Sequence, residues 1–95
     1  MNGLSVNPEL VRQLSSYLND KAVKYDGRLE ELYNKFNNLS NYWSGKDYDA
    51  ANSVMQQNKA PLLELGQTLH QLCNALNMAA DEYERKIRAS AAQFE

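Results

Sequence analysis

The stretch NYWSGKDY, residues 41–48, lies near the middle of this 95-residue chain and predicts the turn between two long helices. Ser44 is a suitable N-cap, because its hydroxyl can accept a hydrogen bond from the backbone N–H of Asp47. Asp47 would then occupy the third helical position. A carboxylate there completes a capping box and meets the positive end of the helix dipole.

Two aromatic residues flank this cap. Trp43 falls just outside the predicted helix and Tyr48 at its fourth position, which are the two positions that pack together in a hydrophobic staple. We therefore expect the indole and the phenol to fix the angle at which the second helix leaves the turn. Gly45 has no Cβ to obstruct the bend.

The first helix has a clear start signal. Asn7 is a good N-cap residue, and Pro8 suits the first helical position, where its missing N–H is not needed. Val6 and Val11 take the staple positions, as Trp43 and Tyr48 do later. Both helices are thus predicted to begin with the same device.

Apolar residues before the turn recur at alternating steps of four and three, the heptad pattern of helices that pack along a seam. They are Leu18, Ala22, Tyr25, Leu29, Leu32, Phe36, Leu39 and Trp43, with Leu10 and Leu14 extending the pattern toward the N-terminus. The pattern keeps its phase through Gly27. We therefore predict one helix over about residues 8–41 and a turn over about residues 42–45.

The same spacing continues after the turn. Its residues are Tyr48, Ala51, Met55, Asn58, Leu62, Leu65, Leu69, Leu72, Leu76, Ala79 and Tyr83, followed by Ile87 or Lys86, then Ser90 and Phe94. This predicts a helix over about residues 46–94. Pro61 removes one helical hydrogen bond, so we expect a kink near residue 61; the alternative is a helix that stops near Asn58 and restarts at Pro61.

The apolar stripe is wider than one neighbouring helix can cover. Adjacent apolar pairs widen it at Leu10–Val11, Leu32–Tyr33, Leu62–Leu63 and Leu72–Cys73. We therefore predict an all-α antiparallel helical hairpin that pairs into a four-helix bundle, with itself or with a similar helical protein. The predicted interface residues are Leu62, Leu65, Leu69, Leu72 and Leu76.

The polar positions of the second helix support two interpretations. Between Ala50 and Ala80 the only charged residues are Lys59 and Glu64, and Asn and Gln fill the other polar positions. Such a face suits partial burial against a partner, because interface centres are depleted in charge. The alternative is an Asn- and Gln-rich surface that faces solvent.

Composition excludes several classes of function. A net charge of −2, with basic and acidic residues interspersed, gives no electrostatic footprint for nucleic acid or for a membrane surface. No apolar run is long enough to span a bilayer, and the first residues lack the pattern of a secretory signal peptide. One cysteine allows no internal disulfide. We expect folding in the cytoplasm and, if the protein is exported, a route that reads no cleavable signal.

No catalytic constellation is present in the sequence, so we predict no enzymatic activity and no cofactor. His70 and Cys73 lie one helical turn apart, which raises a metal or thiol site. Two ligands without a second histidine or a Cys-x-x-Cys motif are a weak signal. We favour Cys73 as a small buried apolar residue and His70 as a flanking residue, and predict no metal.

Trp43-Ser44-Gly45 at the midpoint, long seams on both sides and the start Asn7-Pro8-Glu9 together carry a resemblance. The chain resembles the WXG family of small proteins handled by type VII (ESX-type) secretion in Gram-positive and related bacteria. The resemblance covers essentially the whole chain. It implies a helical hairpin, a homo- or heterodimeric four-helix bundle, and export in folded form without cleavage.

The sequence departs from the family pattern in one place. Members or their partners often carry a Tyr-x-x-x-Asp/Glu export signal after the second helix, but Tyr83 is followed four residues later by Ile87. The signal is therefore degenerate, supplied by a partner, or not needed because the protein is an adaptor.

Three functions follow as hypotheses. The first is a protein exported by a type VII system, in which Trp43 either only caps the turn, which we favour, or also offers a recognition handle to a partner or secretion ATPase. The second is a targeting chaperone for the helical N-terminal domain of a larger toxin. The third is an unrelated structural coiled-coil adaptor.

Overall fold

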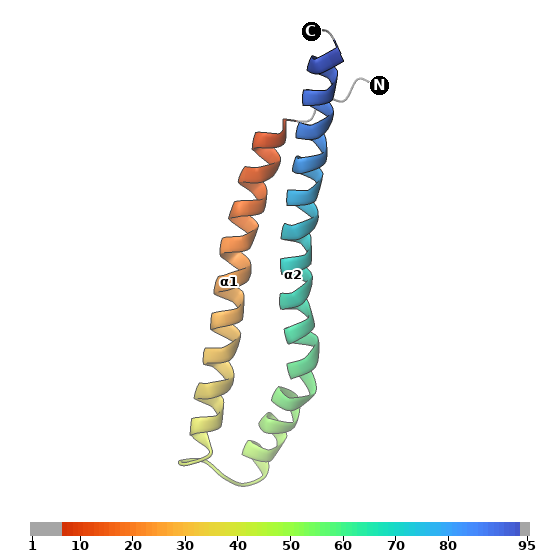
Figure 1. Cartoon of the computed structure of the whole chain (residues 1–95). Helices are drawn as coiled ribbons and strands as arrows, with labels where there is room; N and C mark the ends of the chain where they lie inside the picture. Colours follow the sequence, from red (N-terminus) through yellow and green to blue (C-terminus); the bar gives the residue numbers. More distant parts are fainter. Residues whose placement is uncertain (1–6, 94–95) are drawn as a thin grey trace. The chain divides into compact units, whose positions relative to one another are not determined.

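The computed structural model describes residues 7–93, which form two long α-helices joined by one turn (Figure 1). Helix α1 spans Pro8–Leu39 and helix α2 spans Lys46–Gln93. No strand occurs in this part of the chain. The predicted all-α helical hairpin is therefore confirmed as the fold class, whereas its pairing stays a prediction. Val6 and Phe94 lie outside the described residues.

Helix α1 begins at the predicted cap. The Asn7 side-chain Oδ1 accepts a hydrogen bond from the backbone N–H of Glu9 at 2.9 Å, and the Asn7 carbonyl accepts from Leu10 at 3.1 Å. These bonds satisfy donors that the first helical turn leaves without partners inside the helix. Pro8 occupies the first helical position, and Gly27 lies inside the unbroken helix.

The turn differs in detail from the predicted capping box. The carbonyl of Gly45, and not that of Ser44, accepts the first helical bond of α2, from the N–H of Asp49 at 3.0 Å. Gly45 has a φ of 105°, a backbone conformation that residues with a Cβ rarely adopt. The cap therefore lies one residue later than predicted, and Asp47 moves to the second helical position, still within the first turn near the helix dipole.

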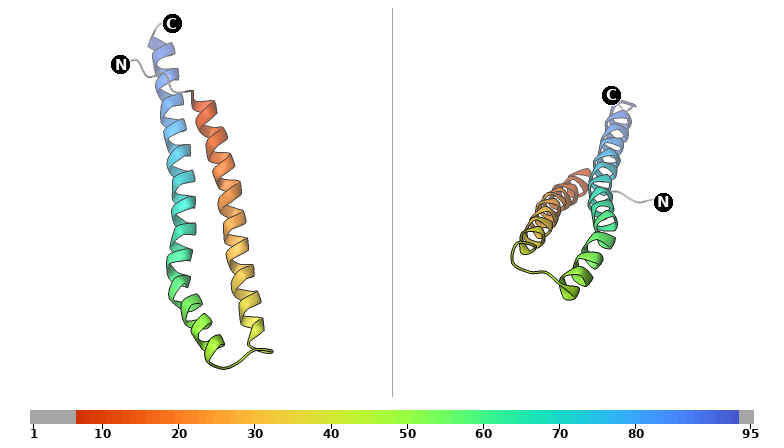
Figure 2. Two further views of the ribbon diagram at one scale, coloured as in Figure 1. Left: turned by 180° about the vertical axis from the view of Figure 1, so that it is seen from behind. Right: turned by 90° about the horizontal axis from the view of Figure 1, so that it is seen from below.

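Helix α2 is continuous through Pro61. In Figure 1 and in the left view of Figure 2, its axis changes direction within the segment drawn in green. Proline has no N–H to offer the carbonyl of Gln57, and its ring crowds that carbonyl. The alternative of a helix that stops near Asn58 and restarts at Pro61 is therefore wrong, and a kink at the missing bond stays a prediction.

The contacts divide the chain into two compact units. The turn unit is Lys21–Thr68, and the terminal unit combines Met1–Asp20 with Leu69–Glu95. Each unit contains a segment of α1 packed against a segment of α2. The two units are described separately below.

Small residues dominate the buried strip between the helices. In the turn unit Ala22, Leu29, Tyr33 and Gly66 are buried, and in the terminal unit Ser15, Cys73 and Ala80 are. Polar groups in this strip find backbone partners: the Tyr33 hydroxyl donates to the carbonyl of Met55 at 2.6 Å, and the Ser15 hydroxyl donates to that of Cys73 at 3.1 Å.

The contact between the two helices buries only part of the predicted apolar stripe. Leu32, Leu65 and Leu72 belong to that stripe, but each is about half exposed, at 49%, 48% and 48%. The buried residue is in each case the next one along the chain. A smaller residue lets two helices approach closely, so Gly66 and Cys73 enter the contact and the leucines turn outward. Leu10 and Leu14 are likewise exposed, while Ser15 is buried.

Candidate pairing surface

The turn unit has one side that is rich in leucine. Tyr25, Arg28, Leu29, Leu32 and Leu62 line a shallow apolar hollow of about 220 Å³ on this side. The hydroxyl of Tyr25 donates to the carbonyl of Leu62 at 2.6 Å, so one side chain spans the two helices. We call this the leucine side; Leu65, one helical turn after Leu62, extends it with a half-exposed side chain.

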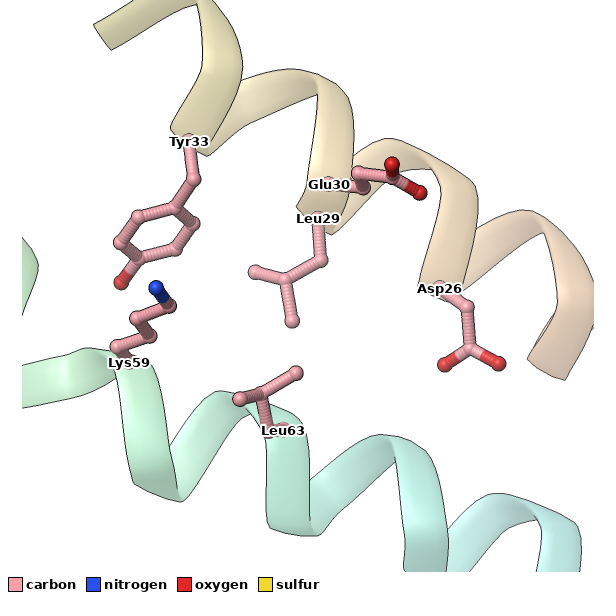
Figure 3. A pocket seen from close by; sticks show the side chains of 6 residues that line it. All are labelled: Asp26, Leu29, Glu30, Tyr33, Lys59 and Leu63. Atoms are coloured by element: carbon pink, nitrogen blue, oxygen red, sulfur yellow. The ribbon is translucent and has the colours of Figure 1, made fainter. Parts of the chain in front are cut away.

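The opposite side of the turn unit is more polar. Its pocket, of about 270 Å³, is lined by Asp26, Leu29, Glu30, Tyr33, Lys59 and Leu63. Figure 3 shows Leu29 and Leu63 facing each other across it, with the Asp26 carboxylate at one end. At the other end the Lys59 ammonium lies 5.6 Å from the centroid of the Tyr33 ring, a cation–π distance.

The five predicted interface leucines have two different environments. Leu62, in the turn unit, and Leu69 and Leu76, in the terminal unit, are half-buried in the contact between their own helices. Leu65 and Leu72 remain exposed to about half of their surface. Leu65 and Leu72 thus offer a larger exposed area to a second chain than the other three do.

The terminal unit also exposes apolar side chains. They are Leu10, Leu14, Tyr17, Leu72, Met78 and Ile87. Single exposed apolar side chains are ordinary in a monomer. Leu10, Leu14 and Tyr17 instead recur at steps of four and three, so they lie along one face of α1.

Three aromatic rings organise the turn. The Trp43 and Tyr48 rings meet edge to face with centroids 5.5 Å apart, the contact that a staple requires. Tyr48 also stacks on Phe36 from α1, with centroids 5.5 Å apart and ring planes 11° from parallel. Trp43 remains 39% exposed. The cluster therefore ties both helices to the turn and leaves part of the indole at the surface.

An ion-pair cluster in the terminal unit was not predicted. The guanidinium of Arg12 donates to Asp81 at 2.6 Å and to Glu84 at 2.8 Å. The hydrogen bonds to these carboxylates raise the pKa of Arg12, and the bond from Arg12 lowers the pKa of Glu84. The partners are 69 and 72 residues apart in sequence, so only the register of the two helices brings them together.

His70 and Cys73 form no metal site in the part of the chain that the structure describes. No group of three His, Cys, Asp or Glu side chains capable of holding a metal ion occurs among those residues. Cys73 is buried at 4% exposure, and its carbonyl accepts the Ser15 hydroxyl. The same residues contain no helix of sufficient length and apolarity for a membrane span. Tyr83 is half-buried and Ile87 is exposed.

The geometry defines a class: a small all-α hairpin with a Trp-x-Gly turn and leucines that its own helices do not bury. A family model described as "Proteins of 100 residues with WXG" matches residues 3–86. The chain therefore belongs to the WXG100 family, the family of small type VII secretion proteins. That family consists of small secreted helical proteins and is not known for enzymes. No curated protein and no solved structure gives a significant match.

Proposed function

We propose that this protein is a non-enzymatic component of a type VII secretion system that acts as one half of a helical pair. The observation that carries the proposal is the outward position of Leu65 and Leu72 beside a buried strip of small residues. Two hairpins that cover each other's leucines would form a four-helix bundle. The pair would be presented to the export machinery in folded form.

The amount of exposed surface supports a partner. The chain exposes 7355 Å². A compact monomer of its mass, 10.8 kDa, exposes about 5500 Å² by the usual scaling of surface with mass. The excess of about 1800 Å² exceeds the roughly 800 Å² that each partner contributes to a standard interface. A second helical hairpin could cover part of it.

A second role is favoured by one observation. The position four residues after Tyr83 holds the exposed Ile87 and no carboxylate. An adaptor that binds the helical N-terminal domain of a larger secreted toxin would not need its own acidic export signal. In that role the toxin, or a similar small protein, supplies the signal.

The pairing surface is tested by two leucines that lie two residues apart on α2. Leu65 is 48% exposed on the leucine side, and Leu63 is 50% exposed beside the opposite pocket. Leu65→Glu places a charge in the proposed interface, and Leu63→Glu is a matched control. We expect Leu65→Glu to weaken pairing at least about tenfold, equal to 1.4 kcal/mol, and Leu63→Glu to leave it nearly unchanged.

Pairing is measured by molar mass in solution over a dilution series, for the chain alone and with neighbouring gene products. In the producing cell, deletion of the secretion ATPase should abolish the extracellular protein. Unchanged extracellular levels, together with equal pairing of the two variants, would refute the proposal. A stable one-to-one complex with a larger toxin would identify the adaptor role.

A further inference from the structure

Met78 is an apolar side chain of α2 that stands on a polar face of the helix. It is 70% exposed, more than any other large apolar side chain in the part of α2 that the structure describes. Seven residues are close to two helical turns, so the residues seven before and seven after Met78 share its face. These are Gln71 and Arg85, and both are exposed. Met78 is therefore an apolar residue between two polar ones on a face of α2 that lies in solvent.

The hairpin contact and the predicted interface leucines both lie on other faces of α2. Cys73, which is buried in the contact between the helices, is five residues from Met78 and about 140° from it around the helix axis. Leu72 is six residues from Met78 and about 120° from it. Neither the hairpin nor the proposed pairing through Leu72 accounts for this exposed thioether.

The three sulfur-containing side chains that the structure describes differ in accessibility. Cys73 is a free thiol at 4% exposure, and a thiol buried in this way is inert. Met55 is half-buried in the turn unit, where its carbonyl accepts the Tyr33 hydroxyl at 2.6 Å. An oxidant in solution therefore reaches the sulfur of Met78 most easily.

A thioether has a defined reaction with a hydroperoxide. The sulfur attacks the terminal oxygen, the O–O bond breaks, and the new S–O bond makes a sulfoxide. The proton of the transferred oxygen passes to the leaving oxygen, which departs as an alcohol, or as water when the oxidant is hydrogen peroxide. A sulfoxide reductase reverses the change: two thiols become a disulfide, and the sulfoxide oxygen leaves as water.

The surroundings of Met78 suit the polar product. One helical turn before it lies Asn74, and one turn after it lies Glu82, which forms an ion pair with Arg85. A sulfoxide disrupts apolar cores and methionine-rich interfaces because it replaces an apolar side chain with a polar one. At Met78 the sulfoxide faces solvent among polar neighbours, so it displaces no packed contact.

We propose that Met78 is a reversible oxidation site, at which hydroperoxides form the sulfoxide while the hairpin stays folded. Its substrate class is the hydroperoxide, and the reaction that consumes the product is reduction by a sulfoxide reductase. The same oxidation at Met55 destabilises the turn unit, because the sulfoxide there enters a half-buried contact. The inference does not depend on the proposed function.

The first test compares the rates of oxidation in the folded chain. The full chain is treated with hydrogen peroxide, and peptides that carry one extra oxygen are quantified over time by mass spectrometry. We expect Met78 to react at least about threefold faster than Met55, with Cys73 still reduced. In urea, which unfolds the chain, the two methionines should react at similar rates. Sulfoxide reductases A and B with a dithiol should then restore the original mass of the Met78 peptide.

Two matched variants separate the effects of the two methionines on stability. Leucine is close to methionine in volume, so Met55→Leu and Met78→Leu each keep the packing and remove one sulfur. Circular dichroism of the untreated variants checks that both are folded. After peroxide treatment, Met55→Leu, which is oxidised at Met78, should keep its Tm. Met78→Leu, which is oxidised at Met55, should have a lower Tm.

Three results would overturn the proposal. The first is equal rates of oxidation at Met78 and Met55 in the folded chain. The second is a lower Tm of Met55→Leu after oxidation, because the sulfoxide at Met78 would then disturb the fold. The third is a Met78 sulfoxide that both reductases leave unchanged, because the site would then not be reversible.

Discussion

The close approach of the helices at Gly66 leads to a prediction about two glycines. Both Gly27 and Gly66 lie inside helices, where alanine is ordinarily better by about 0.8–1 kcal/mol. A Cβ on Gly27 would meet nothing within 4 Å. A Cβ on Gly66 would lie 2.8 Å from Oδ1 of Asp26 and 3.2 Å from Cε1 of Tyr25.

The two contacts at Gly66 differ in how easily they relax. The Asp26 carboxylate ends a flexible side chain, but the Tyr25 ring is held by its 2.6 Å hydrogen bond to the carbonyl of Leu62. Overfilling a packed contact costs about 1–3 kcal/mol. After the helical gain is subtracted, Gly66→Ala should destabilise the fold by about 1 kcal/mol, whereas Gly27→Ala should stabilise it by nearly the same amount.

Thermal and urea unfolding of both variants at one fixed protein concentration tests this, since pairing adds a concentration-dependent term. For a chain of this size, 1 kcal/mol shifts Tm by about 4–8 °C. Gly27→Ala should therefore raise Tm, and Gly66→Ala should lower it. In a Tyr25→Ala background the cost at Gly66 should disappear. Equal stabilisation by both alanines would refute the close approach at Gly66.

Two further predictions concern the turn and the ion-pair cluster. Gly45→Ala should destabilise the fold by about 1–3 kcal/mol in urea unfolding, because its φ of 105° strains any residue with a Cβ; a neutral result would contradict this backbone conformation. Arg12→Gln should destabilise at neutral pH, and the deficit should fade in acid. The hydrogen bond from Arg12 lowers the pKa of Glu84 in the folded state. The Arg12–Glu84 pair therefore stabilises the fold above the ordinary glutamate pKa of about 4.3, and this stabilisation is lost as the pH falls through the lowered pKa. Unfolding titrations from about pH 7 to about pH 3 check this, and a constant deficit would contradict it.

The sequence predicted the helices because their signals are local. The Asn7 cap, the apolar spacing and the aromatic residues around Gly45 each depend on neighbours a few residues away, and the structure shows a capped helix, two helices and a ring contact there. The heptad spacing also correctly predicted one helix through Gly27, since α1 continues past this residue.

The phase of the buried strip could not be decided from hydrophobicity alone. Where a leucine stands next to a small residue in the sequence, burial of either one keeps the heptad spacing. The distance between the helices then decides which of the two residues is buried. One signal was available: Gly66, Cys73 and Ala80 follow each other at seven-residue steps and are all buried. A heptad of small residues indicates closely packed helices.

The ion pairs of Arg12 lay beyond sequence reasoning for a different reason. A helical pattern gives the face on which a residue lies but not the register between two helices whose connection is a turn. Arg12 meets Asp81 and Glu84 only because the register aligns them across more than 65 residues of chain. A slip of seven residues, or about two helical turns, would preserve every heptad position and still separate these charges.

The narrow buried strip and the exposed leucines have one physical cause. If Leu65 and Leu72 filled the contact between α1 and α2, the helices would have to move apart, and the chain would bury its largest side chains by itself. Instead Gly66 and Cys73 are buried in the contact, and Leu65 and Leu72 keep about half of their surface exposed. Burying a leucine fully is worth about 1.5–3 kcal/mol, and in the proposed pair the second chain would supply that burial. In the proposed pair, stability and partner recognition would therefore be coupled: the residues that let the two helices approach also leave the leucines exposed for the second chain.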